Sequence, residues 1–226
     1  MDWTALWLSL QLGFMTILLL IPAALFGARW LAYRQFPGKP LLEALLAAPL
    51  VLPPTVVGYY LLVVLGTQSP VGHWIMHWTG QPLVFHFSGL LIASLIVNIP
   101  FAVQPMQRAF EAIPQDIRDA AACCGMSSWR ALLTVELPLA WPGVLTAMVL
   151  SFAHTLGEFG VVLMVGGSLP GETRTIAISI YDRVQALDFD AAGQMSLILL
   201  VFSISILALA NGLSGHFGRR HGYPEI

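Results

Sequence analysis

The chain has 226 residues, of which 57% are hydrophobic and only 10% are charged, with a formal net charge of −2 at pH 7. Soluble domains carry about 25% charged residues, so this composition excludes an ordinary globular protein and indicates an all-α integral membrane protein surrounded by the lipid bilayer. The charge also argues against a nucleic-acid partner, which would require a basic face.

Five stretches are long and apolar enough to form transmembrane helices, since a bilayer core takes about 20 residues of helix. We expect them in a single transmembrane domain that covers residues 1–226. The first residues lack a basic segment and a small-residue cleavage pattern, so the first stretch is expected to stay as a span. The expected spans are residues 6–28, 44–66, 83–103, 139–165 and 195–213.

Lysine and arginine residues set the orientation, because cytoplasmic loops are enriched in them. With the N-terminus outside, only Arg174 and Arg183 would face outward, and the other eight of the ten basic residues would face the cytoplasm. We therefore expect an outer N-terminus and a cytoplasmic C-terminus.

The second span contains several prolines, among them Pro53 and Pro54. A proline removes a backbone donor and clashes with the preceding turn, so this helix is expected to kink or break. Broken backbone at membrane depth is tolerated where it is packed in protein or lines a wet cavity, and it often marks the substrate route of a transporter. Pro53, Pro54, Thr55 and Gly58 are candidate pathway or gate residues, while a purely structural kink remains the alternative.

Residues 107–138 are expected to form a cytoplasmic loop with two short helices. Pro114 suits a first helical turn, Gly125 suits a left-handed C-terminal position, and Ser127 or Ser128 suits an N-cap. Pro138 is expected to end the loop before the fourth span. By periodicity alone, the loop is either an ordinary surface helix pair or a docking element.

Glu158 is an acidic residue inside the fourth span, and an intramembrane carboxylate is a functional hypothesis by default. His154 lies one helical turn earlier and is the expected partner. The flanking Gly157 and Gly160 can open the backbone and offer amide groups. Gly157, Glu158 and Gly160 are therefore further pathway or gate candidates, although the carboxylate can instead be a structural brace at a helix break.

The segment from 173 to 187 has apolar residues at helical spacing, namely Ile176, Ile180, Val184 and Leu187. This pattern predicts an amphipathic helix at the outer interface. Such a helix can receive a partner protein, with Arg174 and Arg183 as candidate docking contacts, although exposed arginines are usually only solvated. The glycines between Gly212 and Pro224 predict a frayed cytoplasmic tail.

The loop resembles the signature of the membrane subunits of binding-protein-dependent ABC importers, which is Glu-Ala-Ala, three residues, Gly, nine residues, Ile, one residue, Leu-Pro. Asp119 and Val135 depart from that signature but preserve charge or shape. The matching residues are Asp119, Ala120, Ala121, Gly125, Val135, Leu137 and Pro138.

Nearly the whole chain is similar to molybdate permeases, through residues 51–58 and 157–160 and through Pro170, Gly171, Thr173 and Thr175. Sulfate permeases share the Gly-Glu-Phe-Gly stretch, whereas the double proline followed by Thr-Val-Val-Gly is closer to the molybdate group. The resemblance favours molybdate as the transported anion, with tungstate and sulfate or thiosulfate as the alternatives.

The resemblance implies a type I ABC importer permease fold in the cytoplasmic (inner) membrane of a bacterium. It implies a homodimer, two cytoplasmic ATPase subunits that bind ATP and Mg, and an extracytoplasmic oxyanion-binding protein. The matched loop residues would form the coupling helix that fits a groove on the ATPase. The chain has no Gly-x-x-x-x-Gly-Lys-Ser/Thr phosphate loop, so we expect a transport subunit with no enzymatic site, cofactor or metal of its own.

Two other classes of function remain open. An intramembrane metalloenzyme would use His73, His77, His86 and His154 as ligands, yet His73 and His77 lie beside Trp74 and Trp78, where interfacial solvated histidines are common. A scaffold protein would leave residues 115–138 dispensable for any activity.

Overall fold

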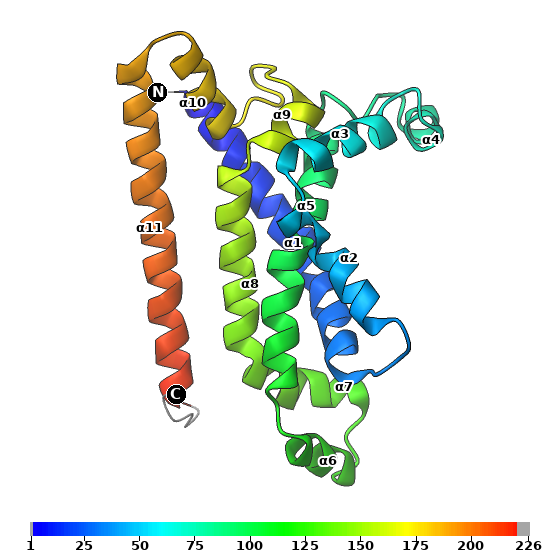
Figure 1. Cartoon of the computed structure of the whole chain (residues 1–226). Helices are drawn as coiled ribbons and strands as arrows, with labels where there is room; N and C mark the ends of the chain where they lie inside the picture. The colour runs from blue at the N-terminus through cyan, green and yellow to red at the C-terminus, as the bar shows by residue number, and fades with distance from the viewer. Residues whose placement is uncertain (1, 221–226) are drawn as a thin grey trace.

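A computed structural model describes residues 2–220 as helices joined by short loops (Figure 1). Within these residues, four helical segments are long and apolar enough to span a membrane, and a bent pair of helices makes a fifth if it counts as one span. The helices are α1 (Trp3–Tyr33), α2 (Lys39–Val51), α3 (Pro54–Leu65), α4 (Pro70–Thr79), α5 (Phe87–Glu111), α6 (Gln115–Cys123), α7 (Ser128–Ala131), the π-helix η1 (Leu132–Glu136), α8 (Leu137–Gly157), α9 (Gly160–Gly166), α10 (Ile176–Gln185) and α11 (Phe189–Arg220).

The helices depart most clearly from the segments expected from the sequence at three places. The expected span 139–165 is interrupted, because α8 ends at Gly157 and α9 begins separately at Gly160. The expected span 83–103 continues as helix to Glu111, so residues 107–111 belong to α5 and not to the loop. The tail expected to fray from Gly212 is helical as far as Arg220, and its remainder lies outside the described residues.

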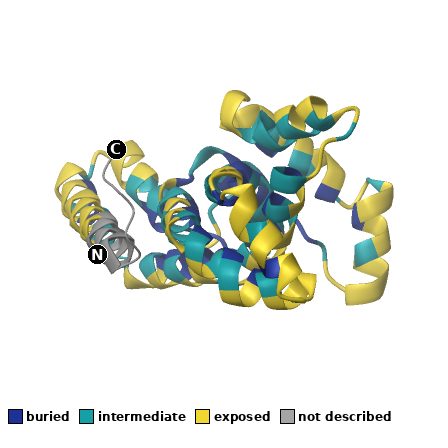
Figure 2. Ribbon diagram, turned by 90° about the horizontal axis from the view of Figure 1, so that it is seen from below, coloured by how far each residue is buried: buried dark blue, intermediate teal, exposed yellow. Residues whose placement is uncertain are grey.

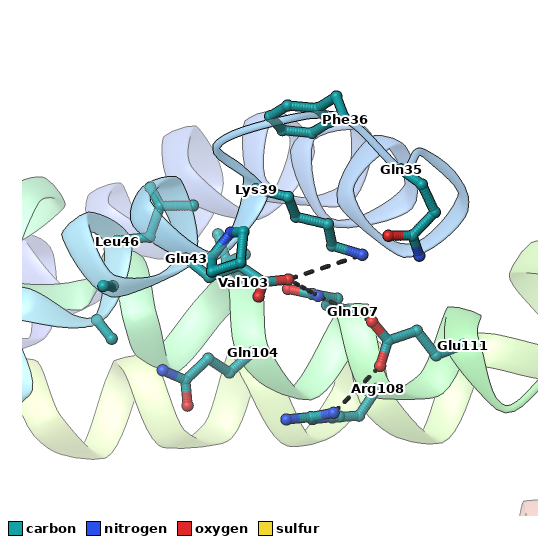
Figure 3. A pocket seen from close by; sticks show the side chains of 13 residues that line it. Gln35, Phe36, Lys39, Glu43, Leu46, Val103, Gln104, Gln107, Arg108 and Glu111 are labelled. Atoms are coloured by element: carbon teal, nitrogen blue, oxygen red, sulfur yellow. Dashed lines mark hydrogen bonds and ion pairs between the residues drawn. The ribbon is translucent and has the colours of Figure 1, made fainter.

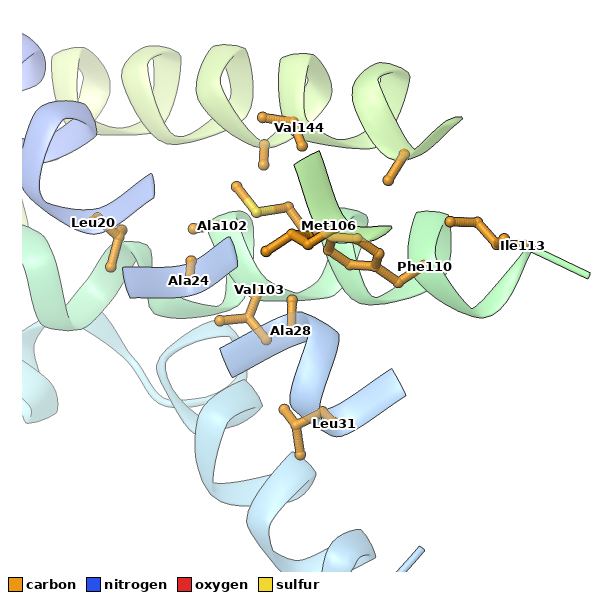
Figure 4. Packing of buried hydrophobic residues seen from close by; sticks show 13 residues of the cluster. Leu20, Ala24, Ala28, Leu31, Ala102, Val103, Met106, Phe110, Ile113 and Val144 are labelled. Carbon is orange, nitrogen blue, oxygen red and sulfur yellow. The ribbon is translucent and has the colours of Figure 1, made fainter. Parts of the chain in front are cut away.

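Helices α1, α5 and α8 pack together as the centre of the molecule. Small side chains such as Ala28, Ala102 and Ala147 are fully buried there, which lets the helix backbones approach closely. Met106 and Phe110 of α5 fill the space between them (Figure 4). This bundle positions both the loop at one end and the helix breaks at the other.

Helix α11 runs along one side of the bundle and packs against α10 and α8 (Figure 1). Most of its described surface is exposed (Figure 2), including Leu197, Leu200 and Ile204. Because these side chains are apolar, they suit lipid or another protein chain rather than water.

The loop helices are capped largely as the sequence predicts. Gly125 has a φ of 72° and the Ser127 side chain accepts a hydrogen bond from the Arg130 amide. Pro114 is the N-cap of α6 rather than a residue of its first turn. The expectation that Pro138 ends the loop is wrong, because Pro138 is the second residue of α8 and η1 precedes it without a break. A proline removes one donor and crowds the previous turn, and a wider π turn accommodates that loss without ending the helix.

Candidate functional site

The residues of the loop signature lie at the end of the bundle opposite the start of α1, where α6 hangs below α5 and α8 (Figure 1). Asp119, Ala120 and Gly125 are exposed, whereas Ala121 is buried at 7% exposure. Val135 and Leu137 are half-buried in η1 and α8, and Pro138 is exposed. One face of α6 and the turn at its C-terminal end are therefore exposed and accessible to another protein.

Polar and aromatic contacts fix this loop to the end of α1. Arg29 Nε lies 2.5 Å from Oε2 of Glu136, which is 4% exposed, and Arg29 Nη2 lies 3.0 Å from its Oε1. The guanidinium of Arg118, on α6, lies 4.0 Å from the centre of the Tyr33 ring. Such stacked and paired arginines hold a surface element in one orientation. A displacement of α6 would therefore also move the end of α1, because these contacts hold the loop against it.

The first helix break separates α2 from α3 by a bend of 108°. Leu52 and Pro53 are extended, as expected because each of them precedes a proline, and α3 then begins at Pro54. The break expected from the prolines is confirmed and lies at Leu52 and Pro53. Pro53, Pro54 and Thr55 are exposed on the surface of the single chain.

The second break separates α8 from α9 at Glu158 and Phe159. The Glu158 side chain is 8% exposed, and its Oε1 accepts a hydrogen bond of 2.9 Å from the Val161 amide. Its Oε2 lies 3.6 Å from Nε2 of His154, the partner expected from the sequence. The carboxylate thus caps one free amide, that of Val161, in the first turn of α9.

The two breaks meet where α3 packs against α9. A Cβ atom on Gly160 would lie 2.8 Å from Cβ of Pro54, and a Cβ on Gly58 would lie 2.8 Å from Cβ of Met164. Side chains at either glycine would push the two helices apart. The structure therefore brings Pro54, Gly58 and Gly160 together, whereas Gly157 has no atom within 4 Å of such a Cβ.

Sequence reasoning missed a row of buried hydrogen bonds that continues from His154 into the bundle. Asn98 Oδ1 lies 3.2 Å from Nδ1 of His154, and Asn98 Nδ2 lies 3.0 Å from Oγ1 of Thr155. Ser94 then joins Thr155 to Thr16 of α1, at 3.3 and 2.8 Å. The signal was present in the sequence, because Asn98 is an amide within a strongly apolar stretch.

A cavity of about 740 Å³ lies between α2 and the α6 end of α5 (Figure 3). Gln107 Nε2 donates to Glu43 at 2.7 Å and to Glu111 at 2.9 Å, so one amide joins the two helices. Lys39 and Arg108 lie beside these two carboxylates, at 3.8 and 3.3 Å. The balanced charges give the cavity no preference for an anion.

The segment after α9 forms the helix α10 at the opposite end of the molecule from α6 (Figure 1). The buried face of α10 differs from the apolar face expected from the sequence. Ile176 and Ile178 are buried, whereas Val184 and Leu187 are exposed. The Ile176 amide donates to Ser9 of α1 at 2.8 Å, which turns this part of the helix inward.

The two outer arginines differ in their contacts. Arg174 lies 3.0 Å from Oγ of Ser168 and 3.5 Å from a carboxylate oxygen of Asp182, so it braces the loop before α10. The Arg183 side chain is 51% exposed and pairs with Asp188 at 3.1 Å. Arg183 is the more accessible of the two for a partner protein.

Within the part of the chain whose side chains are described, no group of three or more His, Cys, Asp or Glu residues is arranged to hold a metal ion. His73 and His77 lie on α4, beside Trp74 and Trp78, which are 63% and 75% exposed. Exposed tryptophans of this kind are typical of a membrane interface.

Residues 13–222 match the family model described as binding-protein-dependent transport system inner membrane component. The molybdenum transport system permease protein ModB of Azotobacter vinelandii is 43% identical over 206 residues, covering 91% of each chain. The sulfate transport system permease protein CysT of Escherichia coli is 31% identical, covering 84% of this chain and 69% of its own. A bacterial alginate ABC transporter, solved in complex with a periplasmic protein that carries an alginate pentasaccharide, has a similar chain. Its TM-score is 0.76 at 17% identity, covering 99% of this chain and 80% of that one.

Proposed function

Because the chain belongs to the binding-protein-dependent transport system inner membrane components, we propose that it is the membrane-spanning subunit of an ATP-driven importer of molybdate. It has the type I ABC importer permease fold and, like its relatives, is a transport subunit without an ATPase site of its own. Molybdate is favoured over sulfate because the identity to the molybdenum permease is higher and extends over more of both chains.

The assembly would contain two copies of this chain, two cytoplasmic ATPase subunits and one extracytoplasmic oxyanion-binding protein, in the inner membrane of a bacterium. ATP and Mg would be bound by the ATPase subunits. Eight of ten basic residues favour the α6 end as the cytoplasmic side, with α1 starting outside. The coupling surface is then Asp119, Ala120 and the turn at Gly125, and α10 with Arg183 would face the binding protein.

The observation that carries the proposed coupling mechanism is the continuous helix from Ser128 to Gly157. It begins beside α6, is fixed to α1 by the Arg29 and Glu136 pair, and ends at the break that Glu158 caps. A displacement of the coupling surface would be carried along this helix to the contact between Gly160 and Pro54. Closure of the ATPases on ATP would thus turn the pathway outward, and hydrolysis would reset it.

The route has to keep a dianion away from hydrocarbon, since desolvating even one charge costs many kcal/mol. The expected spans hold no lysine or arginine at their centres, so the membrane subunit offers no tight anion site and affinity would reside in the binding protein. Pro53, Pro54 and Thr55 are exposed on the single chain and would line the route in the dimer. Glu158 is buried and would brace the gate without contacting the anion.

The test is ATPase activity of the complex reconstituted with its ATPase and binding protein, with molybdate, tungstate or sulfate as the loaded anion. We expect stimulation by molybdate and, because of its similar size and charge, by tungstate. Stimulation by sulfate alone would make the chain a sulfate permease, which the similarity to the Escherichia coli protein makes the second candidate. Failure to form a complex with any ATPase would contradict the importer assignment as a whole.

A further inference from the structure

His154 lies between an amide and a carboxylate inside the bundle. Its Nδ1 is 3.2 Å from Oδ1 of Asn98, its Nε2 is 3.6 Å from Oε2 of Glu158, and the Phe101 ring stacks on the imidazole at 4.1 Å. Both ring nitrogens therefore face an oxygen atom. The two oxygens decide which nitrogen carries a proton.

The orientation of the Asn98 amide follows from its other contacts. Asn98 Nδ2 lies 2.8 Å from the Ser94 carbonyl oxygen, which can only accept a hydrogen bond. Exchanging the amide oxygen and nitrogen would place two acceptors 2.8 Å apart, so Nδ2 is the donor there and Oδ1 faces the histidine. Because Oδ1 also only accepts, Nδ1 of His154 has to carry a proton.

A second proton then makes the contact on the other side of the ring attractive. Nε2 and Oε2 of Glu158 are 3.6 Å apart, within the range of an ion pair but longer than a hydrogen bond, and without that proton only lone pairs face each other there. The other carboxylate oxygen already accepts the Val161 amide. We propose that His154 and Glu158 together bind one proton within the membrane-spanning region, and that Asn98 is the positioning residue that fixes the imidazole for it.

The shared proton makes the pair neutral, whether it resides on the imidazole or on the carboxyl group. An unpaired carboxylate in this layer is costly, and Glu158 is 8% exposed. The functional consequence rests on the proposed transport function. A neutral pair beside the Gly160 and Pro54 contact does not repel a passing dianion, whereas loss of the proton leaves a negative charge there and forces the facing atoms apart.

Among the side chains that the structure describes, other titratable groups do not take part in this contact. Among the described residues, the elements packed against α8 present their charged and phenolic groups in contacts of their own or to the exterior. These groups are Asp2, Arg29 and Tyr33 of α1, Arg108 and Glu111 of α5, Glu136 of η1, Tyr181, Asp182 and Arg183 of α10, and Asp190 of α11.

Solid-state NMR of the complete complex in lipid, with ¹⁵N-labelled histidine, tests the proton directly. The His154 signals are those lost in His154→Gln. We expect Nδ1 to stay protonated throughout, and Nε2 to have a bound or hydrogen-bonded proton that is lost as pH rises. That response should vanish in Glu158→Gln, whose amide donates permanently. A bare Nδ1, or an Nε2 without a proton at every pH, would overturn the proposal.

Activity across pH tests the consequence, with ATPase stimulation of each variant expressed relative to the wild-type complex. Glu158→Gln stays neutral at every pH and keeps an amide donor toward His154. Its activity relative to the wild type should therefore rise about tenfold for each pH unit above the point where the wild-type pair loses its proton. A ratio of variant to wild-type activity that stays constant across pH would refute a role of the shared proton in gating.

His86→Gln is the matched control. His86 has the same kinds of contact, at 3.3 Å to the Val84 carbonyl and 3.8 Å to Glu172, but the Glu172 side chain is 49% exposed whereas that of Glu158 is 8% exposed. The activity of His86→Gln relative to the wild type should not change with pH. An equal rise in this control would also overturn the proposal. The NMR result does not depend on which anion is carried, so failure of the proton site and failure of the molybdate assignment are distinguishable.

Discussion

Replacing Gly160 by alanine should disturb the contact between the two helix breaks. The Cβ of that alanine would lie 2.8 Å from Cβ of Pro54, whereas ordinary contacts are 3.4–4 Å. Helices α3 and α9 would have to separate by several tenths of an ångström. The neighbouring backbone of Pro54 and Thr55 lies 3.6 and 3.7 Å from the same point, so little room exists for a sideways shift.

The expected cost follows from overpacking, which is about 1–3 kcal/mol for an added methyl group in a tight contact. If the contact forms in only one of the two access states, this energy shifts their ratio by about 5- to 140-fold. We therefore expect Gly160→Ala to change ATPase stimulation by the loaded binding protein within that range. Thermal unfolding should show only a modest loss of stability.

Gly157→Ala is the control for this experiment, because it adds the same methyl group three residues earlier at a position with no atom within 4 Å. It should leave stimulation near the wild-type value. Equal effects of the two variants, or no effect of Gly160→Ala, would refute the idea that the spacing of α3 and α9 controls the gate.

Three further predictions concern the loop and the outer face. Arg29→Gln leaves the buried Glu136 carboxylate without its partner and should lower the free energy of unfolding by about 1.5–3 kcal/mol. Arg108→Gln, at a side chain that is 83% exposed, should change it by no more than about 1 kcal/mol. Denaturation in detergent measures both, and equal losses would contradict the anchoring role of Arg29. Ala120→Arg, on the exposed face of α6, should leave folding intact and abolish ATPase stimulation, and a stimulated variant would remove α6 from the coupling surface. Arg183→Ala should weaken stimulation at low concentrations of binding protein and reduce its salt dependence. Unchanged salt dependence would exclude Arg183 from the docking surface.

Local rules predicted several features of the site from sequence. Adjacent prolines cannot continue a helix, so the break at Leu52 and Pro53 followed directly from their chemistry. The left-handed turn at Gly125 and the pairing of His154 with Glu158 also depend only on residues a few positions apart. Features of this kind do not require knowledge of the tertiary fold.

Hydropathy could not locate the end of the fourth span. Residues 159–165 are as apolar as the helix before them, so composition alone favours continuous helix to residue 165. The break at Glu158 exists because the carboxylate caps the start of α9 and because Gly160 packs on Pro54. Both causes involve the path of the folded backbone.

Contacts between distant segments were also beyond sequence reasoning. Asn98 stood out as polar, but its partners Thr155 and His154 come from another helix, whose register against α5 only the fold defines. The same holds for Gln107, which joins Glu43 to Glu111 across the cavity between α2 and α5. A sequence marks such residues as unusual without showing what they contact.

Uptake of labelled molybdate into proteoliposomes is the most direct test of the central claim. The vesicles would contain this chain with its ATPase subunit, and the binding protein and ATP would be supplied on opposite sides of the membrane. The account predicts accumulation that requires ATP on the α6 side and binding protein on the α10 side, and that Ala120→Arg abolishes it. Accumulation without ATP, or with the two sides exchanged, would contradict the account.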